Sequence, residues 1–339
     1  MSRRGPTLED VAREAGVSRA TVSRVVNGVR NVDPGIQDLV RHAIDRTGYA
    51  PNRAARALVT RRAGSVALIV SGVGDAVAAR VFADPFFGRV VSGVLGYLRA
   101  RGTHPVLMFA ESEQAREQAV DYLRQGGADG ALVVSIHGAD PLPQLLADAG
   151  VPTVLFARPD RPQPVSHVDL DHYAGARLAA EHLLARGCRS IATIRAPLDI
   201  PAALDRLGGF RDTLAGAGQH HPPVEEGTFT LASGAEAMTR LLADHPGIDG
   251  VFAANDLMAQ GACQVLREQG RRIPQDVAVV GFDDSAVAAT CRPPLTTVRQ
   301  PVERMAATMA ELLEEQVRGV RTEPASMLFA PELVVRESA

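Results

Sequence analysis

The sequence predicts an α/β protein in which an N-terminal helix-turn-helix domain of three helices precedes a body of two doubly wound, parallel-sheet lobes. A helix-turn-helix pattern occupies residues 8–27. From Ser65 onward, strand and helix patterns alternate, which is typical of parallel sheets. A short motif also recurs, because Leu98–Gly102 and Leu184–Gly187 resemble each other and each precedes a predicted strand. With 339 residues, the chain is long enough for two or three domains.

The first two helices are defined by their capping residues and by the glycine between them. Thr7 is predicted to cap the first helix, with Asp10 as its partner in a capping box. Gly16 supplies the tight turn, and Ser18 is expected to cap the second helix. The apolar faces of the two helices are formed by Leu8, Val11, Ala12, Ala15, Val22, Val25 and Val26.

The outer face of the second helix is polar and basic. Such a helix can lie in the major groove of DNA with its N-terminal residues against base edges. Arginine forms paired hydrogen bonds with guanine, and short hydroxyl side chains suit phosphate oxygens. The predicted DNA contacts of this domain are Thr7, Ser18, Arg19, Ala20, Thr21, Ser23, Arg24, Asn27 and Asn31. The alternative is an ordinary helical hairpin with a solvated basic face.

A third helix completes the small N-terminal domain. It is expected to start at Pro34, with Asp33 as its N-cap, and to end at Gly48. Tyr49 is expected to close the core. The predicted buried stripe of this helix is Ile36, Leu39, Val40, Ala43 and Ile44.

The body shows two series of strands and helices, the second beginning near His167. Continuous apolar runs predict buried strands at 65–71, 105–109, 130–135, 154–156, 190–194, 250–254 and 277–281, with a last strand at 331–336. Amphipathic patterns predict helices near 86–101, 113–125, 142–149, 173–186, 205–216, 233–243 and 256–269.

Charge is distributed unevenly along the chain. Residues 1–62 hold twelve arginines and six acidic residues, a net charge of +6. The remainder holds twenty-four arginines and thirty-three acidic residues, a net charge of −9. This asymmetry suggests that only the N-terminal part meets a polyanion. The sequence contains no lysine, which excludes a Schiff-base lysine and a Walker loop.

Cysteine and hydropathy patterns predict the compartment. Cys188, Cys263 and Cys291 lack the spacing of metal ligands and are expected to be buried thiols in a reducing environment. No signal-peptide pattern and no apolar run of about twenty residues is present. We therefore expect a cytoplasmic, nucleoid-associated protein without metal, cofactor or membrane contact.

Several segments resemble the lactose-repressor (LacI/GalR) family of bacterial transcriptional regulators, and the likeness covers nearly the whole chain. They are Leu8–Asn27, Gly48–Leu58, Asp84–Phe87, Glu181–Gly187, Phe252–Met258, Val280–Asp284 and Pro294–Pro301. The resemblance implies a periplasmic-binding-protein-like body whose chain crosses three times between lobes. It also implies a helix-turn-helix domain at 1–50, a hinge helix and linker at 51–63, and an effector-binding and dimerisation domain at 64–339. Lobe 1 is expected at about 64–165 and 298–328, and lobe 2 at about 166–297 and 329–339.

The hinge segment adds a second set of expected DNA contacts. The resemblance implies paired hinge helices in the minor groove, with Leu58 at the position of an intercalating leucine that kinks the duplex. A helix of two turns is marginal alone, so DNA and a partner chain must stabilise it. The alternative is a flexible tether without base contacts. The predicted contacts are Asn52, Arg53, Ala55 and Leu58.

Ligands of doubly wound lobes bind in the cleft at the carboxyl ends of the strands. Asn255 and Asp283 follow predicted strands there, and the resemblance adds Arg206 and a stacking aromatic, Phe229. Carboxylates and amides can hold sugar hydroxyls, while aromatic rings cover the apolar sugar face. The complete predicted effector site is Asp84, Phe87, His137, Arg158, Arg206, Phe229, Asn255 and Asp283.

Some nearby residues have plainer explanations, and two features depart from the family pattern. Asp256 is equally explained as a helix N-cap, Asp284 as a turn residue and Phe86 as a core residue. The segment 72–82 is longer than the usual link and is predicted to form an extra loop at the cleft mouth. Ala157 stands where many relatives have aspartate, so the effector cannot be copied from a relative.

These patterns together predict an effector-responsive, DNA-binding transcriptional regulator. The main hypothesis is a homodimeric repressor of carbohydrate-utilisation genes, released from a near-palindromic operator when a mono- or oligosaccharide binds the cleft. A corepressor-dependent regulator that responds to a non-sugar metabolite is the alternative. No catalytic residues are predicted, because no dinucleotide fingerprint, nucleophile elbow or metal-spaced histidine cluster is present. An exported sugar-binding protein is disfavoured by the N-terminal DNA reader.

Overall fold

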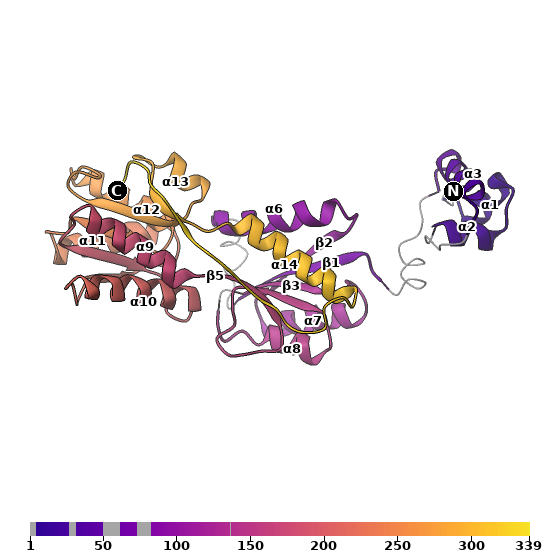
Figure 1. Ribbon diagram of the computed structural model, residues 1–339, viewed down its shortest axis with the longest axis horizontal. Coiled ribbons are helices and arrows are strands. Elements are labelled where there is room, and N and C mark those ends of the chain that lie inside the picture. Colours follow the sequence, from indigo (N-terminus) through magenta and orange to yellow (C-terminus); the bar gives the residue numbers. More distant parts are fainter. Residues whose placement is uncertain (1–4, 27–31, 50–61, 73–82, 136) are drawn as a thin grey trace. The chain divides into compact units, whose positions relative to one another are not determined.

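The computed structural model describes residues 5–26, 32–49, 62–72, 83–135 and 137–339. The chain divides into two compact units, an N-terminal unit of residues 1–64 and a body of residues 65–339. The N-terminal unit contains α1 (Leu8–Ala15), α2 (Arg19–Val26) and α3 (Pro34–Thr47), drawn in indigo in Figure 1.

The helix ends of the N-terminal unit confirm the predicted caps. The Thr7 amide donates to Asp10 Oδ2 at 2.9 Å, and Thr7 Oγ1 accepts from the Asp10 amide at 3.4 Å, so the capping box is complete. Ser18 Oγ accepts from the Thr21 amide at 3.1 Å. Gly16 ends α1 at φ 67°, in the left-handed region where glycine carries no Cβ penalty.

The core of this unit matches the prediction except at Leu39. Val11, Val22 and Val40 are fully buried in one cluster, against which Tyr49 packs. Leu39 is 55% exposed and does not belong to the buried stripe of α3. At 3.6 residues per turn, Leu39 points about 85° away from the centre of the face formed by the other stripe residues. It therefore lies beyond the margin of the core.

The body holds two six-stranded sheets. The first has the order β11-β5-β4-β3-β1-β2, and its strands are all parallel. The second has the order β12-β10-β9-β8-β6-β7 and is parallel except for β12, which pairs antiparallel with β10. The strands are β1 (Ser65–Ser71), β2 (His104–Ala110), β3 (Ala131–Ser135), β4 (Thr153–Phe156), β5 (Ser166–Leu170), β6 (Ile191–Arg195), β7 (Val224–Glu226), β8 (Gly250–Ala253), β9 (Ala278–Asp283), β10 (Thr296–Arg299), β11 (Ser326–Phe329) and β12 (Glu332–Val334).

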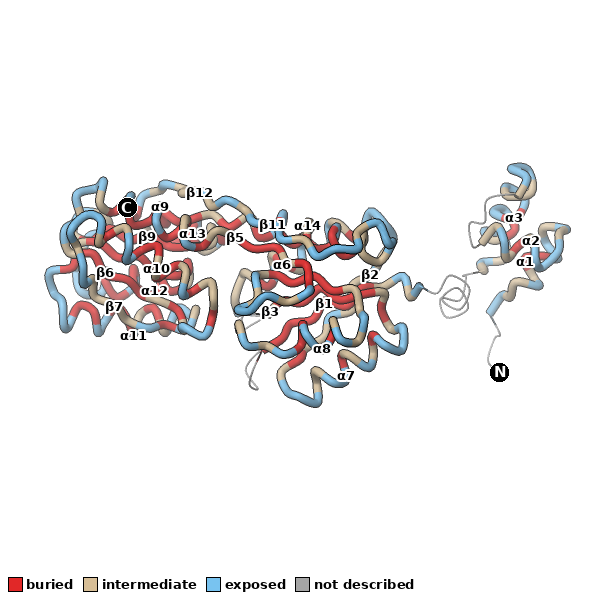
Figure 2. Tube along the Cα trace, turned by 60° about the horizontal axis from the view of Figure 1, so that its bottom comes forward, coloured by how far each residue is buried: buried red, intermediate tan, exposed pale blue. Residues whose placement is uncertain are grey.

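Helices cover both faces of each sheet, and each sheet with its helices forms one lobe. In lobe 1, α6 and α14 pack on one face, and α7 and α8 on the other (Figure 1). In lobe 2, α9 and α10 face α11 and α12 across the sheet. Buried residues follow the inner strands of both sheets, as Figure 2 shows in red. The helices are α6 (Pro85–Arg99), α7 (Glu113–Arg124), α8 (Leu142–Asp148), α9 (His172–Ala185), α10 (Pro201–Gly216), α11 (Leu231–Asp244), α12 (Asp256–Glu268), α13 (Ala286–Thr290) and α14 (Val302–Val317).

Sheet membership corrects the predicted lobe boundaries. The strand β5 belongs to the first sheet, although the sequence prediction placed residues from 166 onward in lobe 2. Conversely, all of β10 lies in the second sheet, so lobe 1 resumes after residue 299 rather than at 298. The chain crosses between the lobes after β5, after β10 and after β11. The boundary was misplaced because β5 continues the first series of strands without an intervening long helix.

The contact between α9 and α10 depends on a glycine. A Cβ on Gly209 would overlap the backbone carbonyl of Tyr173, whereas a Cβ on the neighbouring Gly208 would lie 3.7 Å from the Tyr173 ring, an ordinary contact distance. The two helices therefore approach each other closely at Gly209, and a side chain there would force them apart.

We expect Gly209→Ala to destabilise the protein by about 1–3 kcal/mol, because an overpacked helix contact must separate. The matched control is Gly208→Ala, which has room for the methyl group and should be neutral or stabilising by about 0.5–1 kcal/mol through helix propensity. Urea unfolding followed by circular dichroism measures both. Equal stabilities for the two variants would contradict the close contact.

Candidate functional site

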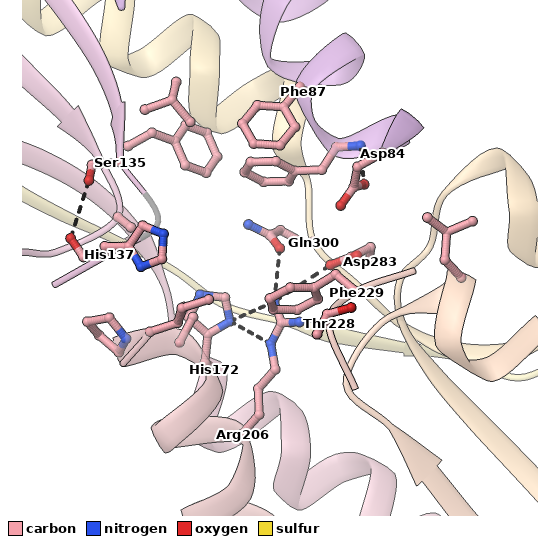
Figure 3. Close-up of a pocket in the computed structure, with 18 of the residues that line it drawn as sticks. Asp84, Phe87, Ser135, His137, His172, Arg206, Thr228, Phe229, Asp283 and Gln300 are labelled. Atoms are coloured by element: carbon pink, nitrogen blue, oxygen red, sulfur yellow. Dashed lines mark hydrogen bonds and ion pairs between the residues drawn. The ribbon is translucent and has the colours of Figure 1, made fainter. Parts of the chain in front are cut away.

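A cavity of about 300 Å³ lies between the two lobes and is lined by residues from both (Figure 3). Sites for small ligands start at about this size. All of the predicted effector residues except Asn255 line this cavity. Those that do are Asp84, Phe87, His137, Arg158, Arg206, Phe229 and Asp283.

Arg206 on α10 is the buried centre of the lobe 2 wall. Its guanidinium donates to the carbonyl of Ala254, at the end of β8, and lies 3.3 Å from His172 Nδ1. It also lies 3.6 Å from Asp283 Oδ1 and stacks 3.7 Å above the ring of Phe282. Burial lowers the pKa of Arg206, but an arginine stays protonated in proteins. The cavity wall thus carries a fixed positive charge.

Two carboxyl groups face this charge from opposite lobes. Asp283 is the last residue of β9 in lobe 2 and has φ 106°, and Asp84 caps α6 in lobe 1 by accepting from the Phe86 amide at 2.9 Å. Burial raises the pKa of Asp283 well above its usual value, with Arg206 opposing that shift. Burial also raises the pKa of Asp84. Each carboxyl group can accept hydrogen bonds from ligand hydroxyls, and in its protonated form it can also donate one.

His172 and Asp169 line the cavity although sequence reasoning missed both. Burial and the neighbouring Arg206 lower the pKa of His172, so its imidazole is neutral and Nδ1 can accept from the guanidinium. His172 Nε2 lies 3.6 Å from Asp169 Oδ1. Both residues stand at the carboxyl end of β5. Assigning β5 to the first sheet would have placed them at the cleft, because strand ends meet there.

Aromatic side chains of both lobes line the cavity. Phe86 packs edge-to-face against Phe87 and Phe156, with ring centroids 5.3 Å apart in each pair. Phe86 therefore lines the cavity as well as packing against the core. Phe229 stands in lobe 2 at φ 64°, a region that non-glycine residues seldom adopt.

Asn255 holds the Phe229 segment rather than lining the cavity. Its Nδ2 donates to the Phe229 carbonyl at 3.1 Å, and its Oδ1 accepts from the Met258 amide at 2.9 Å, which caps α12. Both ends of the amide are therefore engaged, and the side chain is buried. Asn255 therefore does not line the cavity, because the helix cap takes its acceptor and the Phe229 carbonyl takes its donor.

Polar contacts bridge the lobes around the cavity. Arg158, which follows β4, pairs with Asp205 on α10 at 2.6 Å. His137, which follows β3, pairs with Asp199 at 2.8 Å. Arg89 on α6 donates to the carbonyl of Asp283 at 2.8 Å. These contacts join the two lobes directly.

Asp256 lies behind the cavity wall and does not line it. It is the first residue of α12, and Asn255 is the cap, so the N-cap explanation was wrong for Asp256 as well. Its carboxylate accepts from the Ser285 amide at 2.7 Å and from Thr297 Oγ1 at 2.6 Å. Burial raises the pKa of Asp256 to about 6.

The N-terminal unit presents the predicted reading face of α2. Arg19, Ala20 and Arg24 are exposed, whereas Val22 is fully buried. Arg19 pairs with Glu9 at 3.2 Å across the helix-turn-helix. The predicted contacts Asn27, Asn31, Asn52, Arg53, Ala55 and Leu58, and the predicted loop at 73–82, lie outside the described residues.

Within the described ranges, no group of three or more His, Cys, Asp or Glu side chains is placed to hold a metal ion. Among the same residues, no helix is both long and apolar enough to cross a membrane.

Comparison with known proteins agrees with this combination of a helix-turn-helix unit and a two-lobed body. Residues 7–52 match the model of bacterial regulatory proteins of the lacI family, and residues 180–339 match a periplasmic binding protein-like domain. The transcriptional regulator CelR of Thermobifida fusca is 47% identical over 340 residues, covering 99% of both chains. The ribose operon repressor of Escherichia coli K12 is 31% identical, covering 98% of this chain and 99% of that one.

Solved structures show the same architecture. A complex of CelR with cellobiose superposes with a TM-score of 0.77 at 45% identity, covering 98% of this chain and all of that one. The lac repressor dimer bound to operator and an anti-inducer gives a TM-score of 0.85 at 28% identity, covering 99% of both. Fold and site thus define a DNA-binding transcriptional regulator with an effector-binding body. The chain belongs to the LacI family of bacterial regulatory proteins.

The raised pKa of Asp256 makes stability depend on pH. Because the folded carboxyl binds its proton more tightly than an unfolded aspartate, its contribution to stability is complete below about pH 4 and is lost as pH rises through about 6. Replacing Asp256 by Asn removes this dependence. We therefore expect the stability of Asp256→Asn relative to the wild type to improve, on the order of 2 kcal/mol, between pH 4 and pH 7.

Urea unfolding of both proteins at pH 4, 5, 6 and 7 measures this difference. Asp244→Asn, at an exposed carboxyl group ending α11, is the control for a surface substitution. A stability difference between wild type and Asp256→Asn that does not change with pH would contradict the burial argument.

Proposed function

We propose that this regulator is a homodimeric repressor of carbohydrate-utilisation genes, released from a near-palindromic operator when a glucose disaccharide of the cellobiose type enters the cavity between the lobes. It acts in the cytoplasm, where the operator is. The observation that carries the proposal is the cavity itself, in which a buried arginine and carboxyl groups face aromatic rings.

The lining fits a sugar better than an apolar or a strongly anionic ligand. Asp84, Asp169 and Asp283 offer acceptors for hydroxyl hydrogens, while Arg206 offers donors. The phenyl rings of Phe86 and Phe229 can pack against the apolar faces of pyranose rings, with which polar side chains make poor contacts. The relative that shares 45% identity with this chain was solved with cellobiose, which supports a disaccharide rather than a monosaccharide.

Release follows from the placement of the site between two lobes. A ligand that contacts Asp84 in lobe 1 and Asp283 in lobe 2 favours one angle between the lobes over others. If operator DNA favours a different angle, each ligand must weaken the other by the same factor. Coupling of about 1–3 kcal/mol is typical of such systems.

On the DNA side, the dimer presents two α2 helices to successive major grooves. The proposed contacts from the described part are Thr7, Ser18, Arg19, Ala20, Thr21, Ser23 and Arg24, together with the hinge residues predicted above. Arg19 must break its ion pair with Glu9 to reach DNA. This costs little free energy, because both side chains are exposed. We take the dimer surface to include α6 and parts of lobe 2, as the family resemblance implies.

The direct test measures fluorescence anisotropy of a labelled duplex from the region upstream of the gene. We expect cellobiose to weaken binding by about fivefold or more, in line with the coupling expected of such systems. Asp283→Ala should abolish this response, because the cavity loses its lobe 2 acceptor. Asp244→Ala, which removes a carboxyl group outside the cavity, should respond like the wild type. Tighter DNA binding with cellobiose, or no response to any sugar, would contradict the proposal.

Arg24 is expected to read a base. Arg24→Ala should weaken operator binding by about 1–3 kcal/mol and random-sequence binding much less. Arg41→Ala on α3 removes the same charge away from the reading face and is the matched control. Competition titrations at one fixed salt concentration give both affinities. Equal losses on operator and random DNA would instead identify Arg24 as a phosphate contact.

A further inference from the structure

A second cavity, the arginine cup, lies in lobe 2 and shares no lining residue with the cavity between the lobes. It is open to solvent, has a volume of about 450 Å³, and is formed by the C-terminal end of α12, the segment that follows it, the segment after α13 and the C-terminal segment. Four arginines line it, Arg267, Arg271, Arg272 and Arg292, together with one acidic residue, Glu337.

Three of these arginines form no salt bridge in the described part of the chain, although Arg271 helps to lower the pKa of Asp276. Arg267 Nε donates to the Cys263 carbonyl at 3.2 Å, and Arg271 donates to the Pro246 carbonyl at 2.8 Å. The side chain of Arg292 has no hydrogen bond or ion pair among the described residues. Arg272 is different, because it is paired with Asp276 at 2.6 Å. Most of the donor capacity of the other guanidiniums is therefore unused.

The arginine cup contrasts with the rest of the body. The body carries a net charge of −9, and its other arginines include many that pair with acids, such as Arg89 with Glu303 and Arg240 with Glu225. A cation at a helix C-terminus is favoured by the helix dipole, which accounts for Arg267 near the end of α12. The dipole does not account for Arg292, which reaches the same cavity from another element.

We propose that the arginine cup binds a small anion that bears phosphate groups. Guanidinium groups present forked donors that match phosphate oxygens in pairs. Arg267, Arg272 and Arg292 are exposed, and because they line one open cavity with Arg271, several guanidiniums can contact the same anion. The volume exceeds what a single carboxylate fills, and it accommodates two linked phosphates. This site would give the regulator a second metabolite input, separate from the sugar cavity.

Isothermal titration calorimetry of the full chain with pyrophosphate, at constant ionic strength and without divalent metals, tests the proposal. We expect saturable binding by the wild type. The double variant Arg267→Gln, Arg292→Gln should bind about tenfold more weakly or worse, a loss of about 1.4 kcal/mol. Glu337→Gln should bind more tightly, because it removes the single acidic group that lines the cup. Circular dichroism and urea unfolding check that each variant is folded.

Two matched controls separate the cup from general attraction of anions. Arg211→Gln removes an exposed arginine of α10 that lies outside both cavities, and it should bind pyrophosphate like the wild type. Arg24→Gln lowers the charge of the basic N-terminal unit and should also leave the affinity unchanged. The proposal is overturned if the wild type shows no saturable binding, or if the double variant retains wild-type affinity. A loss of affinity in Arg24→Gln equal to that in the double variant would also overturn it.

Discussion

The body is organised around a positive charge buried where the lobes meet. A guanidinium without partners would be very costly there, and the cost is offset only because several elements supply partners at once. For Arg206 these are the Ala254 carbonyl at the end of β8, His172 at the start of α9, Asp283 at the end of β9 and the ring of Phe282. The ends of β8 and β9 must therefore keep their register, because otherwise the buried guanidinium of Arg206 loses the partners that offset its desolvation.

The same pairing prepares the cavity for a polar ligand. His172 is held neutral by burial and by Arg206, so it accepts from the guanidinium rather than repelling it. Asn255 fixes the Phe229 segment from behind and leaves the aromatic side facing the cavity. Preorganised groups lose little freedom on binding, so more of the contact energy appears as affinity. Arg158 and Asp205 join the lobes directly. A bound ligand therefore acts by changing the relative free energies of the lobe angles rather than by bringing separate lobes together.

Much of this arrangement could be predicted from local sequence signals. Caps such as Thr7 and Ser18, and strand-end residues such as Asp283, depend on neighbours in the chain and were located correctly. What failed depended on tertiary context. Asn255 has the right chemistry and position for a ligand contact, but the sequence cannot show that its amide is used by a helix cap and by Phe229.

The placement of β5 shows the second kind of limit. A strand pattern gives an element but not the sheet it joins, and this ambiguity hid Asp169 and His172 from the predicted site. Leu39 shows another limit of sequence-based prediction. An apolar residue at the margin of a helical stripe is equally compatible with a place in the core and with exposure to solvent. In each case a local pattern was recognised, and the long-range partner that decides its role was not.

The discontinuous lobes also determine when the protein can fold during synthesis. Lobe 1 begins at β1, yet α14 and β11, which complete it, are among the last elements of the chain. Until α14 emerges from the ribosome, the apolar residues of α6 and of the first sheet that it covers have no partner. Lobe 2 lacks only β12 and the buried C-terminal residues Ser338 and Ala339 by the time β10 is made. Lobe 1 is therefore synthesised first but cannot complete its fold until the C-terminal part of the chain has been made. Until then, one of its hydrophobic faces stays exposed.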